Sequence, residues 1–217
     1  MLNNIDITVT LIIILLTCVI SFTAFSNDKI TNDLIFYPPA VTNNNQWYRF
    51  ITCGFIHADF MHLAFNMYTF YIFGNKVEDA FIQIFDTSGK ALYIILYISS
   101  LVASLLPTYL KHKRDSYYRS LGASGAVSAV IFAGIVLYPT MGLQIFPIPI
   151  NIPAFIFGPL YLIVSAILAK KGHGNINHSA HIWGAIFGVL FIVVTAQFLS
   201  EFRPVEHFIN QVSGYFK

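Results

Sequence analysis

Six long apolar stretches, separated by polar and charged segments, dominate the pattern of the chain. Each is close to the roughly 20 residues that an α-helix needs to cross a bilayer. Their approximate ranges are 7–25, 55–73, 91–109, 121–138, 152–169 and 179–199. The pattern therefore predicts an all-α polytopic membrane protein, a bundle of six transmembrane helices.

The segments between these stretches have the composition of loops. Residues 27–46 are polar and rich in asparagine, and residues 111–119 are the most charged part of the chain. Residues 139–153 are rich in proline and apolar side chains without forming a plausible span. Because no internal repeat or linker is visible, residues 1–217 are expected to form a single membrane domain.

Composition supports lipid as the solvent of this chain. Hydrophobic residues make up 56% of it and charged residues 10%, with a mean hydropathy of +0.67, whereas a soluble domain carries about 25% charged residues. The net charge of +2 and the absence of a basic stripe argue against nucleic acid as a partner. Cys18 and Cys53 both lie in apolar context and are expected to be free packing residues.

The charges of the loops leave the orientation open. One side carries eight cations and the other four, so the positive-inside rule places the first side in the cytoplasm. The first set is Lys29, Arg49, Lys111, Lys113, Arg114, Arg119, Lys170 and Lys171, and the second is Lys76, Lys90, Arg203 and Lys217.

Polar residues within the apolar stretches are candidates for function, because burying them in lipid is costly. His62 and Asn66 are four residues apart and share one helix face. Ser124 stands between Gly122 and Gly125 at the start of the fourth stretch, where unpaired helix N–H groups suit a developing oxyanion. The alternatives are that Asn66 joins neighbouring helices and that Ser124 belongs to a close-packing surface.

A third polar position opens the sixth stretch. His181, Gly184 and Gly188 fall on one stripe, and a Gly-x-x-x-Gly pattern brings two helix backbones close together. If the partner is the glycine-flanked start of the fourth stretch, His181 reaches Ser124. Because a neutral histidine is the usual base for a serine nucleophile, the pair predicts a catalytic dyad, with no carboxylate in a span placed to orient the histidine.

At this point the chain resembles a rhomboid intramembrane serine protease. The resemblance extends from about Trp47 to the end of the sixth stretch and rests on four motifs in order. They are Trp47-Tyr48-Arg49 with Thr52, His62-x-x-x-Asn66, Gly122-x-Ser124-Gly125, and Ala180-His181-x-x-Gly184-x-x-x-Gly188.

The resemblance implies a role for each matched residue. Ser124 is the expected nucleophile and His181 the expected general base, with the Ser124 N–H, His62 and Asn66 forming the oxyanion hole. Arg49 and Glu78 are expected to be structural, shaping the first loop and the turn between the second and third spans. The family opens its site to the outer face, which places the more cationic loops outside, contrary to the charge rule.

One position departs from the family pattern. Many members carry an aromatic residue four positions after the serine, stacked on the histidine, where this chain has Ser128. The base is therefore held more loosely, or by another aromatic such as Trp183. His178, one turn from His181, is expected in the loop or cap.

The expected activity is a serine endopeptidase that cleaves single transmembrane helices, without a cofactor or metal, in the plasma (inner) membrane of a bacterium. One alternative is a catalytically silent relative that binds transmembrane helices. Another is a transporter or a metal or haem protein, although the spacings are poor for it. Its ligands would be His57, His62, His178 and His181.

Overall fold

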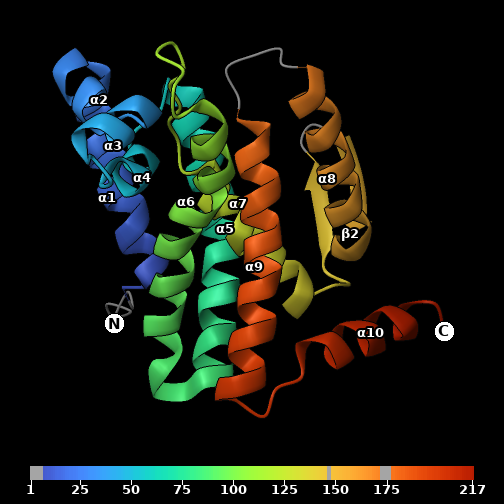
Figure 1. The fold of residues 1–217 in the computed structure, drawn as a ribbon. Helices are drawn as coiled ribbons and strands as arrows, with labels where there is room; N and C mark the ends of the chain where they lie inside the picture. Colours follow the sequence, from blue (N-terminus) through green and yellow to red (C-terminus); the bar gives the residue numbers. More distant parts are fainter. Residues whose placement is uncertain (1–6, 146–147, 172–176) are drawn as a thin grey trace.

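The computed structural model describes residues 7–145, 148–171 and 177–217. Figure 1 shows an upright bundle of long helices with shorter helices at one end and a helix lying across the other. The elements are α1 (Val9–Phe25), α2 (Asp28–Leu34), α3 (Pro38–Asn44), α4 (Arg49–Thr52), η1 (Cys53–Phe55), α5 (Phe60–Phe85), η2 (Asp86–Ser88), α6 (Gly89–His112), α7 (Ser124–Leu137), β1 (Gly142–Ile145), β2 (Ile148–Pro153), α8 (Ala154–Lys171), α9 (His178–Leu199) and α10 (Pro204–Tyr215).

Each of the six apolar ranges falls on one of these helices. Two helical stretches, Phe60–His112 and His178–Leu199, are long and apolar enough to cross a membrane. Three more helices are apolar but shorter, at Val9–Phe25, Ser124–Leu137 and Ala154–Lys170. The predicted helical bundle is therefore present, while six complete crossings stay a prediction.

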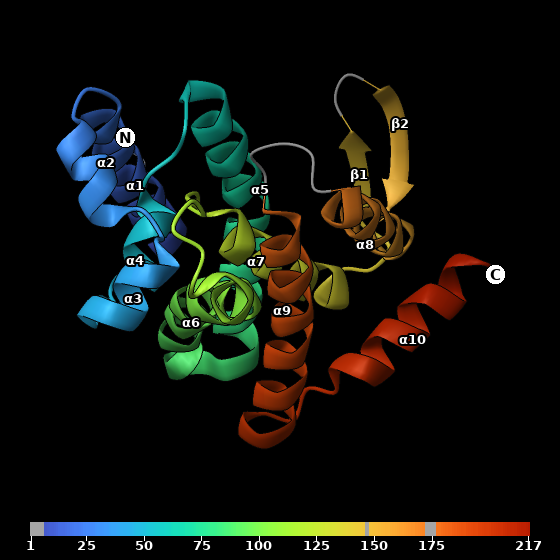
Figure 2. The same cartoon turned by 45° about the horizontal axis from the view of Figure 1, so that its top comes forward.

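Helix α7 forms the centre of the bundle. All of its residues except Ser124 are buried, and it packs most closely against α9. A Cβ atom added at Gly184 would overlap the carbonyl of Gly125, and one added at Gly188 would overlap the carbonyl of Ala129. The predicted glycine stripe is confirmed, and it sets the backbones of α7 and α9 in direct contact (Figure 2).

The expectation of an all-α chain is wrong for the segment between α7 and α8. There β1 and β2 form an antiparallel hairpin, in which Gly142 pairs with Pro153 and Gln144 with Asn151. The proline at position 153 ends the ladder, which agrees with its lack of an N–H donor. The hairpin returns the chain to the start of α8.

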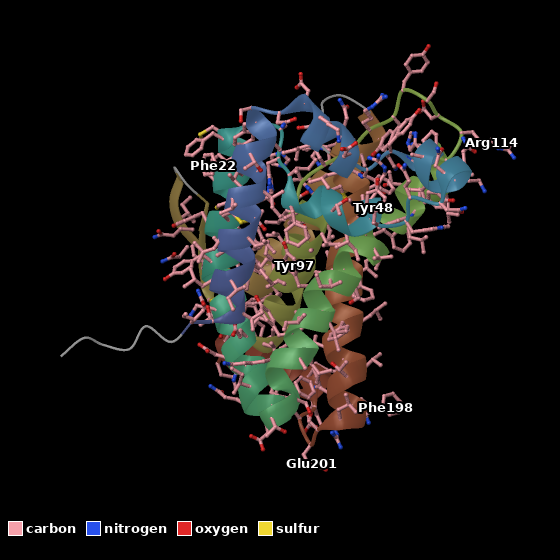
Figure 3. All side chains as sticks on the ribbon, turned by 90° about the vertical axis from the view of Figure 1, so that its left-hand side faces the viewer. Phe22, Tyr48, Tyr97, Arg114, Phe198 and Glu201 are labelled. Carbon is pink, nitrogen blue, oxygen red and sulfur yellow. The ribbon has the colours of Figure 1, made fainter. Side chains whose placement is uncertain are left out.

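Glu78 is structural, but its predicted place in the turn between the second and third spans is wrong. Glu78 lies within α5, and its carboxylate accepts hydrogen bonds from the N–H groups of Val9 and Thr10, each at 2.8 Å, and from the Thr10 hydroxyl at 2.9 Å. The negative charge caps the N-terminus of α1, where it also matches the helix dipole. Figure 3 shows Tyr97, which is fully buried, beside α1, while Phe22 and Phe198 point outward.

Arg49 holds the first loop together, as predicted. Its buried guanidinium donates to the carbonyls of Asn32 and Ile35 at 2.8 and 2.7 Å, and to the side chain of Gln46. A buried cation with three hydrogen bonds fixes the segments on both sides of α3. Both cysteines are free, and Cys53 is buried, as expected.

Candidate active site

Ser124 and His181 meet although 57 residues separate them in the sequence. The Nε2 atom of His181 lies 2.8 Å from the Ser124 hydroxyl oxygen, within hydrogen-bond distance. Ser124 is the first residue of α7, and His181 lies in the first turn of α9. Asn177 caps α9 by accepting the Ala180 N–H and joins α6 through Thr108. The predicted dyad is therefore brought together by the contact between α7 and α9.

The segment leading to Ser124 is fixed at three points. Ser120 exchanges two backbone hydrogen bonds with Phe36, and the Gly122 N–H donates to the Cys53 carbonyl at 2.9 Å. Gly122 has φ +109°, a conformation that favours glycine. A Cβ there would also meet the ring of His62 at 2.8 Å. Gly122 is thus required both by the turn and by the close approach of the imidazole.

His57 provides the third point, a role that the sequence reasoning missed. Its Nε2 accepts the N–H of Ala123 at 3.3 Å, and its Nδ1 lies 3.0 Å from the Ser21 hydroxyl. The Ser21 hydroxyl in turn donates to the Phe55 carbonyl. This chain of bonds ties the residue before Ser124 to α1. The only signal in the sequence was a histidine among apolar residues, which did not indicate its partner.

His62 and Asn66 line the same cavity as Ser124 and His181. The amide nitrogen of Asn66 donates to the His62 carbonyl at 2.9 Å, which fixes the direction of the side chain along α5. Ala123 offers no side-chain cap to α7, so the first-turn N–H groups stay available near the Ser124 hydroxyl. Donors from two helices therefore surround the space beside the dyad.

The ring of Tyr161, on α8, replaces the aromatic residue missing at position 128. It stacks on His181 with the ring centroids 6.2 Å apart and the planes 23° apart. Its hydroxyl lies 2.9 Å from the hydroxyl of Ser128. Trp183, the aromatic suggested by the sequence, is 44% exposed and is not among the residues that line the cavity beside the dyad. A tyrosine within an apolar helix gave no sequence signal for this role.

A cavity of about 1000 Å³ gives access to the dyad. Its walls come from α5 on one side and α8 on the other, with α7 at the back. The wall residues are Phe65, Asn66 and Thr69 on α5, Phe157 and Tyr161 on α8, and Val127, Ser128 and Ile131 on α7. The cavity is therefore apolar along its sides and polar where the dyad lies.

The loop before Ser124 forms part of the rim of this cavity. His112 stacks on Tyr118 with centroids 3.9 Å apart, and its Nδ1 lies 3.0 Å from the Asp115 carboxylate. That hydrogen bond holds the pKa of Asp115 below its usual value. The guanidinium of Arg119 lies over the ring of Tyr37. These contacts order a rim that carries aromatic and cationic side chains.

The four histidines proposed as metal ligands do not form a common site. His57 and His62 contact each other edge to face, as do His178 and His181. Within residues 7–145, 148–171 and 177–217, no three histidine, cysteine or acidic side chains come together as ligands. His178 opens α9, as expected for a residue at the cap.

Comparison with known proteins yields one family and several relatives. The family model of the Rhomboid domain matches residues 44–198. The "Putative rhomboid protease YdcA" of Bacillus subtilis is 28% identical over 71% of this chain and 70% of its own length. RHOMBOID-like protein 12, mitochondrial, of Arabidopsis thaliana is 32% identical over 62% of this chain and 42% of its own. The human presenilin-associated rhomboid-like protein, mitochondrial, is 30% identical over 64% and 35%.

Proposed function

The chain belongs to the rhomboid family of membrane proteins, and on that premise we propose that it is an intramembrane serine endopeptidase. The observation that carries the proposal is the 2.8 Å contact between the Ser124 hydroxyl and the His181 Nε2 at the base of a cavity. A serine and a neutral histidine at this distance are the nucleophile and base that acyl transfer to a hydroxyl requires.

The proposed reaction follows from the positions of the two side chains. His181 takes the proton of Ser124 while the Ser124 oxygen bonds to the scissile carbonyl carbon. The C–N bond then breaks, and His181 returns the proton to the leaving amine. Water hydrolyses the acyl-enzyme by the same route. No carboxylate of the described residues is hydrogen-bonded to His181, so stacking by Tyr161 supplies its orientation instead.

The oxyanion of the tetrahedral intermediate needs donors that are fixed before the reaction. We assign this role to the Ser124 N–H and the side chains of His62 and Asn66. Their support is that both side chains line the cavity and that Asn66 is held by its bond to the His62 carbonyl. The ring of His62 is in turn fixed against Gly122.

The proposed substrates are single transmembrane helices of other proteins. The cavity is open between α5 and α8, with apolar walls that suit a segment arriving from lipid. Such a segment must unwind to present a carbonyl, and small residues at the cut make that approach easier. We further propose that α1 and α5–α9 each cross the membrane, which gives six crossings. The proposed location is the plasma membrane of a bacterium, since one of the relatives is from Bacillus subtilis.

The test is cleavage of a single-span substrate by the purified protein in detergent. Replacing Ser124 with alanine, or His181 with alanine, is expected to lower turnover by at least about 10³-fold, because neither residue can act without the other. Melting temperatures near that of the wild type show that both variants fold. Ser99→Ala, on α6, is the matched control and should retain full turnover.

The alternative is a silent relative that binds transmembrane helices without cutting them. A fluorophosphonate probe separates the two, because it reacts only with an activated serine. Labelling that disappears in Ser124→Ala supports the peptidase. If the folded wild type binds single transmembrane helices but is neither labelled by the probe nor able to cleave them, the protein is a catalytically silent relative.

A further inference from the structure

Helix α10 is amphipathic and lies across the end of the bundle opposite to the cavity (Figure 1). The first residue of α7, Ser124, lies at the cavity, and the last, Leu137, lies at the opposite end of the bundle. There the Nε2 atom of His207, on α10, is 2.9 Å from the Leu137 carbonyl oxygen. At 100° per residue, one half of α10 is apolar and the other polar. The apolar half is Pro204, Val205, Phe208, Ile209, Val212, Tyr215 and Phe216, and the polar half is Glu206, His207, Asn210, Gln211 and Ser213.

Only part of this apolar half is covered by the protein. Pro204 is buried and Phe208 packs against the core of the bundle. Val205 and Ile209 are 55% and 56% exposed, and Phe216 is 72% exposed. A row of large apolar side chains therefore continues past the bundle along one edge of α10.

This exposed edge forms one wall of a hollow. The hollow lies between α9 and α10, has a volume of about 350 Å³, and is lined by Val193, Gln197, Pro204, Val205 and Ile209, with Arg203 and Glu206 at the polar edge. The neighbouring outer face of α9 is also apolar and exposed, at Leu190, Val194 and Phe198, and Figure 3 shows Phe198 pointing away from the bundle. The hollow thus lies beside an exposed apolar face of α9.

The polar edge carries charges of both signs. The guanidinium of Arg203 is partly exposed, lies 3.7 Å from the carboxylate of Glu201 and donates to the backbone carbonyls of Ser200 and Phe202. Glu206 is exposed on the first turn of α10. Arg203 beside the carboxylates of Glu201 and Glu206 disfavours a headgroup with a net negative charge. The same three charges complement a headgroup that carries both a phosphate and an ammonium.

The far end of α10 has the composition of a membrane interface. Tyr215 and Phe216 contact the ring of Phe155 at the start of α8, with centroids 5.5 and 5.9 Å apart. Aromatic side chains gather at the level of lipid headgroups, and a helix with one apolar face lies in that plane. The C-terminal end of α10 therefore carries side chains of the kind found at the level of lipid headgroups.

We propose that α10 lies in the plane of the membrane surface and that the hollow binds one phospholipid with an amine headgroup, such as phosphatidylethanolamine. One acyl chain fills the space against Val193, Val205 and Ile209. The phosphate faces Arg203 and the ammonium faces Glu206. The proposal is independent of peptidase activity, since it rests on surfaces at the opposite end of the molecule.

Photo-crosslinking of the full chain in lipid vesicles tests this site. The photoreactive residue p-benzoylphenylalanine replaces Ile209, or Asn210 as the control on the polar face. The vesicles contain equal amounts of phosphatidylethanolamine and phosphatidylglycerol. After irradiation, intact mass is expected to show a phosphatidylethanolamine adduct at position 209 and none at position 210. Arg203→Gln is expected to reduce the adduct at 209 by about fivefold, as for one cation near a lipid surface, and Lys217→Gln to leave it unchanged.

The remaining outcomes overturn the proposal. No lipid adduct at position 209, or equal adducts at 209 and 210, shows that α10 does not lie with this face in lipid. A crosslinked dimer at 209 shows that a second copy covers the face. Adducts that are mainly phosphatidylglycerol refute the headgroup assignment.

Discussion

Among the described residues, one aromatic ring from another helix, that of Tyr161, stacks on the imidazole of His181. Tyr161 stacks on the imidazole and its hydroxyl meets Ser128, so one side chain contacts both the base and the helix of the nucleophile. Ser128 is much smaller than an aromatic residue, and the Tyr161 side chain of α8 packs beside it with the two hydroxyls 2.9 Å apart. The pair Ser128 and Tyr161 thus replaces one aromatic residue on α7.

Two substitutions at position 161 distinguish the contribution of the Tyr161 ring to kcat from that of its hydroxyl. Tyr161→Phe keeps the stacked ring and loses a hydrogen bond worth about 1 kcal/mol, so kcat should fall by no more than about fivefold. Tyr161→Ala also removes the ring, and kcat should fall by about 10-fold or more, with a smaller change in KM. Cleavage kinetics in detergent measure both. Tyr68→Phe, at an exposed position on α5, is the control, and an unchanged kcat in Tyr161→Ala would refute the role.

At the scale of elements, the contact between α7 and α9 sets the geometry of the dyad. Gly184 and Gly188 bring the α9 backbone against the carbonyls of Gly125 and Ala129. The two helices cannot approach this closely with any side chain at those positions. Since Ser124 and His181 stand at the first turns of these helices, their separation follows from the glycine contact.

Gly188→Val is therefore expected to push α9 away from α7. Overpacking of this kind costs about 1–3 kcal/mol, and the contact here is with backbone, which cannot rotate away. The melting temperature should fall by about 3–10 °C, and turnover should fall as the dyad widens. Leu190→Val, on the exposed face of α9, places the same side chain two residues away and should change neither quantity. A wild-type melting temperature in Gly188→Val would argue against the contact.

The sequence predicted the helices of the bundle because apolar runs are local patterns, and it predicted the dyad because a local motif marks each of its two residues. Apolar runs of about twenty residues indicate helices, and the spacing of His181, Gly184 and Gly188 indicates one helix face. The β1–β2 hairpin escaped prediction because its strands lie in a proline-rich apolar segment without clear alternation. Helix α10 was missed although its period was readable, with Pro204 at its first position and an apolar face over the following turns.

At the scale of the whole molecule, α1 connects the two ends of the protein. Glu78 caps its N-terminus, and Ser21 near its other end binds His57, which in turn holds the N–H of Ala123. Neither contact was predicted, because no motif in the sequence marks Val9, Thr10 or Ser21 as a partner. Helix α1 lies outside the residues that match the Rhomboid domain, yet it supports the segment that carries the nucleophile.

Glu78→Gln tests whether this connection stabilises the fold. The amide keeps the shape of the side chain but removes the charge that faces the N-terminus of α1, and its NH₂ group turns a donor toward the N–H of either Val9 or Thr10. Hydrogen bonds to a charged group contribute about 1.5–3 kcal/mol, so the melting temperature should fall by about 3–10 °C. The matched control is Asp79→Asn, which makes the same change at an exposed neighbour and should leave the melting temperature within about 1 °C of the wild type. If Glu78→Gln melts with the control, the charge of Glu78 does not stabilise the position of α1. If Glu78→Gln melts earlier than the control and also loses activity below its melting temperature, the position of α1 affects the active site. The route is then the hydrogen bond from Ser21 of α1 to His57.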